Sequence, residues 1–516
     1  VSYATILSNE IDADLNLLSP EFEHSWFDRA APTLTGSYGA IATSNNSNEF
    51  DATLVELAFH DNEQDARLLR DPRVRRAMAR ACVHGITRFL NTLAGSPVPL
   101  AFAPDTPRNP RVLDLGGGNI SVAWNAPLSN GAVGDPATGY VIYRSSNGYG
   151  FGNPIVVGNV TSVTLTGVPA GQTIYLRIAA TNAGGESMPT ETLAVRRPSN
   201  GSLADVLVVN GYDRMRRQTN PIQTLTQPPA YAGQSMERVI WRKNNSLDYI
   251  VQHAESLAAA DVGFVSCANE AVISGAVGLP AYEAVVWILG RESTQDRTFD
   301  ATEQSLVTAY LTGGGSLFVS GSELAWDLGA SGNGPVFLSS ILRVSYSADD
   351  ANTYLASGVA GSIFADLGTI DFGQPAGAPY DASTPDVFTA SFDAQPCLIY
   401  SGGTGGIAAI QYSGGGYRLV VMGFPFEAIG SATSRDALME RAIDYLLARP
   451  PVLPFDFDGD GDVDIDDFYA YEFCCQGPDN VYGPTHLCVI MDGDGDLDVD
   501  LADAALFQVT FTGPGS

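Results

Sequence analysis

The chain has 516 residues, 45% of them hydrophobic, so it is too long for one core and has the apolar content of folded domains rather than of a disordered chain. Its 58 acidic and 27 basic residues give a formal net charge of −31, which argues against binding to nucleic acid or anionic lipid and favours binding of cations. No apolar run is long enough to span a bilayer, and the chain opens on Val-Ser-Tyr without a leader, so we expect a processed product or a fragment.

Proline- and glycine-rich joints divide the chain near residues 92–110, 197–204 and 449–454. They predict a multidomain protein with segments at residues 1–92, 105–196, 204–448 and 455–512. Six cysteines are too few for a disulfide scaffold, and the lack of a CxxC pair argues against a zinc ribbon.

The first segment predicts a strand followed by a helix. Residues 53–59 form a mostly apolar run that one carboxylate, Glu56, interrupts. Asp71-Pro72 is typical of a helix cap and first turn, and apolar residues then keep helical spacing toward Leu90. This order indicates the last βα unit of an α/β domain.

Residues 54–62, together with Asp65-Ala66, Leu68-Leu69 and Asp71-Pro72, resemble the C-terminal end of zinc-dependent N-acetylmuramoyl-L-alanine amidases. The resemblance implies that Glu56 is the acid/base of a metal-assisted amide hydrolysis. A glutamate on an apolar strand would be desolvated, which raises its pKa. The alternative is a structural glutamate paired with an arginine. That family's two His and one Glu zinc ligands precede the motif, so Zn²⁺ is expected only in a full-length amidase domain.

The second segment predicts a β-sandwich. Short alternating strands at residues 120–124, 140–143 and 174–178 are separated by turn residues. The pattern resembles fibronectin type III, with Trp124 on the second strand and Tyr175 at the position of the corner tyrosine. The resemblance implies a spacer or binding module without catalysis.

The third segment alternates strands with helices and predicts an open parallel α/β sheet. The expected strands are residues 205–210, 284–289, 316–320 and 419–423, and the expected helices are residues 248–260 and 301–311. Residues 248–254, 269–272, 287–294 and 321–323 resemble the glutamine-amidotransferase-like, flavodoxin-like domain of proteins sometimes labelled xanthan lyase.

The parent superfamily of that domain carries a Cys nucleophile on a strand-to-helix turn, and the matching residues 318–323 contain none. Ser322 is the candidate nucleophile, and Glu292 with Glu323 is a candidate carboxylate pair at the C-terminal edge of the sheet. The one histidine of the segment, His253, lies on an earlier helix. We therefore expect a binding or scaffold domain, with an active hydrolase as the alternative.

The fourth segment predicts two calcium loops, because residues 451–516 hold 15 acidic residues and no Lys or Arg. In the first loop, oxygens at positions 1, 3 and 5, Gly461 at 6, an apolar residue at 8 and acids at 9 and 12 meet the EF-hand requirement. Its candidate ligands are Asp456, Asp458, Asp460, Asp462, Asp464 and Asp467.

The second loop has two possible registers. Placing Asp503 at position 12 leaves Leu497 at position 6, whereas placing Gly495 at position 6 puts Ile490 and Leu501 at positions 1 and 12. We favour the first register and expect a weaker site there. Its candidate ligands are Asp492, Asp494, Asp496, Asp498, Asp500 and Asp503. The alternative to both loops is a solvated acidic linker.

The duplicated loop resembles a type I dockerin-like domain, a small α-helical EF-hand-like fold. The resemblance implies Ca²⁺ as cofactor, helices that pack together after each loop, and a cohesin-like protein as partner. Among Cys474, Cys475 and Cys488, one local disulfide is expected.

Taken together, the segments favour a secreted, extracellular or cell-envelope protein that contacts peptidoglycan or another cell-surface polysaccharide. The first hypothesis is an N-acetylmuramoyl-L-alanine amidase followed by non-catalytic modules. The second is a non-catalytic adhesion or scaffold protein, and a third is polysaccharide processing by residues 204–448.

Overall fold

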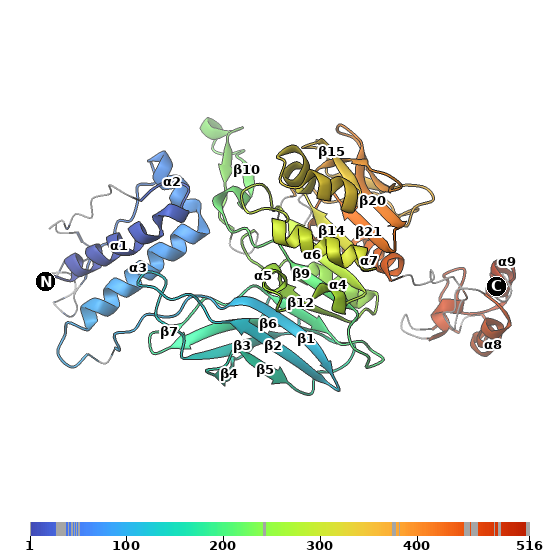
Figure 1. The fold of residues 1–516 in the computed structure, drawn as a ribbon, viewed down its shortest axis with the longest axis horizontal. Coiled ribbons are helices and arrows are strands. Elements are labelled where there is room, and N and C mark those ends of the chain that lie inside the picture. Colours follow the sequence, from blue (N-terminus) through green and yellow to red (C-terminus); the bar gives the residue numbers. More distant parts are fainter. Residues whose placement is uncertain are drawn as a thin grey trace. The chain divides into compact units, whose positions relative to one another are not determined.

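The computed structural model describes residues 2–26, 33, 38, 39, 41, 42, 45, 47, 49, 52–96, 98–240, 244–373, 378–380, 382–447, 455, 463–478, 480–482 and 487–511. The chain divides into two compact units, Val1–Glu440 and Arg441–Ser516 (Figure 1). Within the described ranges, no helix has both the length and the apolar character needed to cross a membrane.

The first unit begins with packed helices, α1 (Tyr3–Leu18), α2 (Glu63–Arg70) and α3 (Pro72–Leu90). Buried apolar side chains of α1 and α3 form one small core, and the two helices approach closely at Gly85, where a Cβ would lie 2.6 Å from Leu7 Cδ1.

The predicted start of α3 is confirmed. Asp71 accepts a hydrogen bond from the Arg73 N–H at 2.9 Å, and Pro72 is the first helical residue, where its missing N–H costs nothing. The cap at residue 71 therefore fixes where the helix begins.

Residues 105–196 form the predicted sandwich. Its strands are β1 (Arg108–Gly116), β2 (Asn119–Asn125), β3 (Gly139–Ser145), β4 (Ile155–Gly158), β5 (Ser162–Leu165), β6 (Thr173–Asn182), β7 (Gly185–Glu186) and β8 (Leu193–Arg196). One sheet has the order β1-β2-β5 and the other β4-β3-β6-β8. Trp124 lies buried between them, against Tyr140.

A parallel sheet follows, in the order β12-β9-β13-β14-β21. Its strands are β9 (Val206–Asn210), β12 (Phe264–Ala268), β13 (Ala284–Gly290), β14 (Ser316–Gly321) and β21 (Tyr417–Met422). All side chains of β9, β12, β13 and β14 are buried, as expected for strands covered on both faces.

Helices pair on the faces of this sheet. They are α4 (Ile250–Ala259), α5 (Asn269–Ile273), α6 (Ala301–Thr312) and α7 (Ala432–Leu446). Ser256 on α4 donates to Asp436 on α7 at 2.7 Å, and Asn269 on α5 donates to Glu303 on α6 at 3.0 Å. The strand order reverses at β9, because the chain runs from β9 to β12 on one side and then from β12 to β13 on the other.

Antiparallel strands extend the sheet beyond β21. They are β15 (Val344–Ala348), β16 (Leu355–Gly358), β17 (Ile370–Asp371), β18 (Val387–Ala390), β19 (Gln395–Tyr400) and β20 (Ile407–Gly414). A separate hairpin pairs β10 (Ile222–Thr224) with β11 (Ser235–Glu237).

The sandwich and the parallel sheet share a junction, which we call the seam and which consists of β1, β8 and β12. β12 pairs antiparallel with β1 through Val112 and Ser266, and the Ser266 hydroxyl donates to the Ala194 carbonyl of β8 at 2.7 Å. Buried side chains of both parts belong to one hydrophobic cluster. The joint at residues 197–204 therefore connects two parts of a continuous core.

The second unit contains α8 (Ile465–Cys474) and α9 (Leu501–Thr510). Its small core gathers buried residues that precede the loops, lie within them or belong to the helices: Phe455, Val463, Tyr471, Cys474, Cys488, Met491, Val499 and Phe507.

Candidate functional sites

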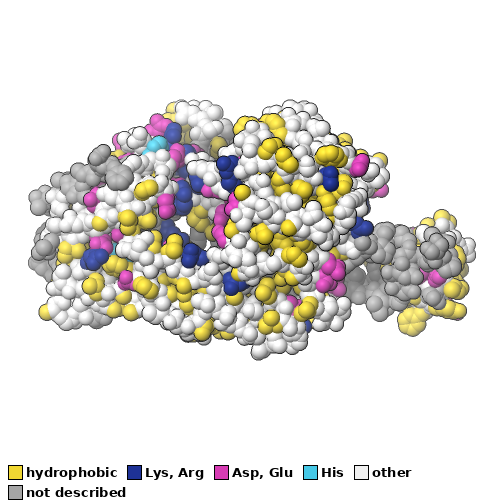
Figure 2. All heavy atoms as spheres, in the orientation of Figure 1, with side chains coloured by type: hydrophobic (Ala, Val, Ile, Leu, Met, Phe, Trp, Pro, Cys, Tyr) yellow, Lys and Arg dark blue, Asp and Glu magenta, His cyan; other side chains and the backbone are white. Residues whose placement is uncertain are grey.

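Carboxylates gather where the parallel strands end. Asp213 follows β9, Glu270 follows β12, Glu292 follows β13 and Glu323 follows β14, and Glu303 joins them from the first turn of α6. We call these five residues the acidic edge. Figure 2 shows acidic and basic side chains interspersed over the middle of the drawn face. The C-terminal edge of a parallel sheet is where such folds bind ligands.

Four carboxyls of the acidic edge, those of Asp213, Glu292, Glu303 and Glu323, have raised pKa values. Burial raises the pKa of Glu303 to about 7. Desolvation, followed by the charge of Glu270 and a hydrogen bond with it, raises the pKa of Asp213 to about 7 even though water reaches its side chain. Burial raises the pKa of Glu292 well above its ordinary value, and Asp213 adds to that shift.

Glu292 and Glu323, the predicted carboxylate pair, each bond to other partners. Glu292 is 1% exposed, and its Oε1 accepts from the Arg214 N–H at 2.7 Å. Glu323 accepts from the Ser293 hydroxyl at 3.0 Å and from the Thr384 hydroxyl. Both carboxylates thus fasten loops at the sheet edge.

Ser322 lies fully buried beside this edge, and its hydroxyl has no hydrogen-bond partner in the described part of the chain. His253 is engaged elsewhere, because its Nε2 lies 3.2 Å from Glu427 Oε2, and Tyr380 donates to the other oxygen of Glu427 at 2.5 Å. Sequence reasoning missed this buried His–Glu–Tyr chain, whose members are far apart in the sequence. The structure does not bring Ser322 and His253 into hydrogen-bond contact.

Residues 53–59 do not form the predicted strand. They are unpaired, and no other strand lies among the described residues of 1–92 to supply a partner. Glu56 is exposed, and so are its neighbours Leu54 and Val55. The expected desolvation of Glu56 was therefore wrong, because a strand becomes dry only when another strand and a core cover it.

Within residues 1–92, Glu10, Asp14 and His84 are the described group whose ligand atoms lie within 4.8 Å of one another. His84 Nδ1 lies 2.7 Å from Asp14 Oδ2, and Arg88 donates to Glu10 at 2.5 Å. Phe102 stacks on the His84 ring with centroids 3.9 Å apart. These contacts fit a structural network better than an open zinc site, because Glu10 already bonds to Arg88 and Asp14 already lies against His84 Nδ1.

The second Asp-rich loop is described throughout. Asp492 accepts from the Gly495 and Leu497 N–H groups at 2.8 and 2.9 Å, and Asp503 accepts from the Gly493 N–H at 2.7 Å. Leu497 and Gly495, which stand at position 6 in the two registers, both have left-handed φ values, of 75° and 79°, so the contact between the start of the loop and Asp503 is what distinguishes the registers. This geometry favours the register with Asp503 at position 12.

The carboxylate oxygens of this loop gather in two groups. Asp492, Asp494 and Asp496 form one group of ligand atoms within 4.8 Å of one another, and Asp498, Asp500 and Asp503 form another. Carboxylate oxygens are the donors that Ca²⁺ prefers, so the residues present fit that ion.

The described half of the first loop matches the second. The Asp464 N–H donates to Asp467 Oδ2 at 2.8 Å, and the Asp500 N–H donates to Asp503 Oδ2 at 2.8 Å. Asp467 and Asp503 are both buried, and a helix begins two residues before each of them. The other predicted ligands of the first loop, Asp456, Asp458, Asp460 and Asp462, lie outside the described residues.

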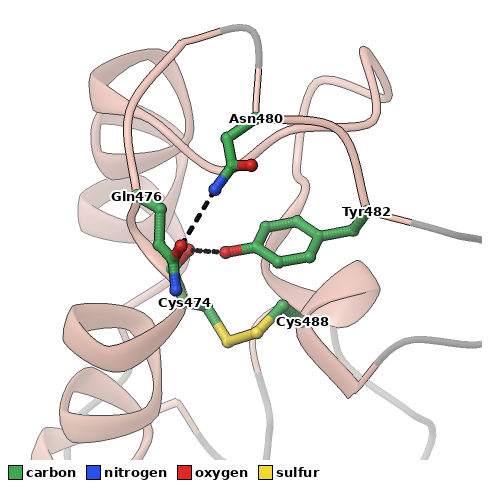
Figure 3. The surroundings of a disulfide bond; sticks show 5 residues. All are labelled: Cys474, Gln476, Asn480, Tyr482 and Cys488. Carbon is green, nitrogen blue, oxygen red and sulfur yellow. Dashed lines mark hydrogen bonds between the residues drawn. A yellow bond between two sulfur atoms is a disulfide. The ribbon is translucent and has the colours of Figure 1, made fainter.

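One disulfide crosses the segment between the loops, as expected, and it joins Cys474 at the end of α8 to Cys488 (Figure 3). The Tyr482 hydroxyl donates to the Cys474 carbonyl at 2.5 Å, and Asn480 donates to Gln476 at 2.9 Å. Cys475 carries a free thiol. The disulfide ties the inter-loop segment to the first helix.

Residues 105–196 match the family described as fibronectin type III domain. Similar solved structures include the twitchin kinase region from C. elegans, at 26% identity over 19% of this chain and 18% of that one, with a TM-score of 0.18. The FN5 domain of Drosophila Lar is 21% identical over 19% of this chain and 98% of its own, with a TM-score of 0.16. The sixth fibronectin type III domain of human fibronectin type III domain containing protein 3 is 25% identical over 19% and 87%, with a TM-score of 0.17.

This chain spans less than a fifth of the twitchin structure. Residues 105–196 are thus a fibronectin type III domain within a multidomain chain that also contains helices.

Proposed function

We propose that the chain belongs to a secreted, cell-envelope-associated modular protein whose C-terminal unit is a dockerin-like domain that binds two calcium ions and docks onto a partner. The observation that carries this proposal is the gathering of the aspartates of the second loop into two groups of ligand atoms, at a spacing that the sequence of the first loop repeats. An acidic linker has no need of such a repeat.

Calcium titration of the full chain by isothermal calorimetry tests the metal. We expect two sites, of which Asp467→Ala removes one and Asp503→Ala the other, because each loses the carboxylate that closes its loop. Glu472→Gln is the matched control, since its side chain is exposed on α8 outside both loops. Two intact sites in both Ala variants would contradict the proposal.

Exposed apolar side chains support docking. When residues are counted from the first position of each loop, positions 10 and 18 fall on the helix that follows the loop. They are Ile465 and Phe473 on α8, and Leu501 and Val509 on α9. Phe473 is 75% exposed and Val509 84%, so both helices leave apolar surface that a partner could cover. The two helices thus present equivalent apolar stripes, and a cohesin-like protein is the proposed partner.

Double substitution Phe473→Ala and Val509→Ala tests docking. We expect loss of binding to a cohesin in the presence of Ca²⁺, with calcium affinity unchanged, as measured by surface plasmon resonance. Retained cohesin binding would contradict the proposed surface.

For residues 204–448 we propose a flavodoxin-like scaffold without hydrolase activity. The parallel order β12-β9-β13-β14-β21, numbered by chain position, is 2-1-3-4-5, the order of flavodoxin-like sheets. The engagement of His253 with Glu427 rather than with Ser322 supports a non-catalytic role. Loss of polysaccharide turnover on Ser322→Ala, Glu292→Gln or Glu323→Gln would contradict it.

The amidase resemblance of residues 54–90 makes peptidoglycan the proposed substrate class of the whole protein. Glu56 is accessible to solvent, so a substrate could reach it. Muropeptide release by the full reading frame, compared with Glu56→Ala and with zinc quantified, tests this. Release that persists in the variant would exclude Glu56 as the catalytic acid/base. If the protein releases no muropeptides and binds no zinc, the adhesion or scaffold hypothesis remains.

A further inference from the structure

A small cavity opens where the strand order reverses. It is lined by Glu191, Asn210, Tyr212, Leu247, Tyr249 and Ile288. Asn210 ends β9 and pairs with β12 on one side and with β13 on the other, so the cavity lies at the switch point of the parallel sheet. Glu191 comes from the fibronectin type III domain, just before β8. The site is thus completed across the seam.

Three buried polar atoms on residues that line this cavity have no hydrogen-bond partner in the described chain: Asn210 Oδ1 and the hydroxyls of Tyr212 and Tyr249. Asn210 is 7% exposed and Tyr212 is 2% exposed. The Asn210 NH₂ group donates to the Thr192 carbonyl at 3.1 Å and also hydrogen-bonds to Glu191, so the Asn210 side chain retains its oxygen as an unpaired acceptor. Buried polar groups are normally paired, so an unpaired set implies a ligand or water.

The fold holds Tyr212 in place. Gly290, at the end of β13, has a φ of 52°, and a Cβ there would lie 2.1 Å from Tyr212 Cδ1. The Tyr212 ring also stacks on Tyr249 with centroids 4.5 Å apart. The phenol therefore has little freedom to turn away from the cavity.

The chemistry of the lining favours a cation. Burial raises the pKa of Glu191 well above its ordinary value, with Glu270 and Asp213 adding to the shift and a hydrogen bond from Asn210 opposing it. No ion pair from Glu191 to a basic side chain occurs among the described residues. A cation bound beside this carboxylate would compensate the surrounding negative field.

The size of the cavity restricts the cation. It has room for one group of about the size of a water molecule, which excludes a quaternary ammonium. Only one carboxylate lines it, too few for Ca²⁺, which takes several oxygen ligands. Glu191, Asn210 Oδ1 and the Tyr212 hydroxyl offer three acceptors to the three N–H donors of a primary ammonium, whose carbon substituent must lie outside the water-sized space.

We infer that this cavity binds the primary ammonium group of a small amine, held by Glu191, Asn210 and Tyr212. The fibronectin type III domain then supplies the acidic wall of a binding site, and the Glu191 carboxyl releases its proton when the ammonium binds.

Saturation-transfer NMR of the full chain with methylammonium chloride tests the inference. We expect a saturable methyl signal whose Kd rises at least tenfold in Glu191→Gln and in Tyr212→Phe, each of which removes one interaction with little change of shape. Glu186→Gln and Tyr143→Phe are the matched controls on the same domain, because these side chains bond to each other outside the cavity.

Tetramethylammonium should not compete, since its head is too large. A signal that does not saturate, or one that is equal in the variants and the wild type, would mean that the cavity holds only water. Equal competition by Na⁺ or K⁺ would replace the ammonium with a general monovalent cation. Either result overturns the inference.

Discussion

Replacing Glu303 by glutamine should change how the stability of the first unit depends on pH. Glu303 is 3% exposed, accepts from the Asp300 N–H at 2.7 Å in the capping box of α6, and also accepts from Asn269. Burial raises its pKa from 4.5 to about 7. Because the higher pKa belongs to the folded state, that state binds the proton more tightly.

The sign and size of the effect follow from linkage. The contribution of protonated Glu303 to the free energy of unfolding is fully present below the unfolded pKa of 4.5. It is lost as the pH rises through the folded pKa of about 7. A shift of this size corresponds to about 3 kcal/mol, of which about 2.5 kcal/mol falls between pH 5 and pH 8. Glutamine does not titrate, so the variant does not show this fall in stability over this pH range. The variant loses one hydrogen bond at every pH, which costs about 1 kcal/mol.

Urea unfolding of the wild type and of Glu303→Gln at pH 5 and pH 8, with calcium held constant, measures the difference. We expect the variant to gain about 2.5 kcal/mol relative to the wild type on going from pH 5 to pH 8. Glu283→Gln, an exposed glutamate of the same domain, controls for the loss of one charge. A relative stability that stays constant, or that moves the other way, would refute the reasoning.

Three further predictions concern other parts of the chain. Replacing Cys474 and Cys488 by serine should destabilise the second unit by about 3 kcal/mol, because the disulfide closes a loop with a sequence separation of 14; unchanged hydrogen exchange in α8 would contradict this. Gly495→Ala should weaken calcium binding about tenfold in calorimetry, since a φ of 79° costs an L-residue roughly 1–2 kcal/mol; equal affinity would argue against the loop geometry. Asp14→Asn should cost roughly 1–3 kcal/mol in thermal unfolding, because the buried His84 Nδ1 loses its hydrogen bond to the carboxylate; an unchanged Tm would be inconsistent with a buried hydrogen bond.

Local signals in the sequence were sufficient for several elements. Some features depend only on residues that are adjacent in sequence. They are the α3 cap at Asp71, the apolar runs of β9 and β13, and the alternation around Trp124. The strands of the fibronectin type III domain followed from these local patterns, whereas pairings between strands that are not neighbours in sequence, such as β3 with β6, depended on the resemblance to that fold.

Features that depend on distant partners could not be predicted in this way. Residues 53–59 have the composition of a strand, but a strand needs another strand to pair with it. Likewise, Glu191, Asn210 and Tyr212 meet only because β12 joins the sandwich to the sheet. The unusual feature visible in the sequence was Leu497, whose placement at a glycine position became intelligible once its backbone angle was known.

The seam has a consequence for how such proteins are inherited. A fibronectin type III domain is usually thought of as a cassette that recombination can insert or remove on its own. Here, removing residues 105–196 would strip β12 of its neighbour β1 and leave an unpaired strand edge, which promotes aggregation. We therefore expect the sandwich and the parallel sheet to travel through evolution as one unit, with recombination breakpoints at the outer joints, residues 92–110 and 449–454, and not at residues 197–204.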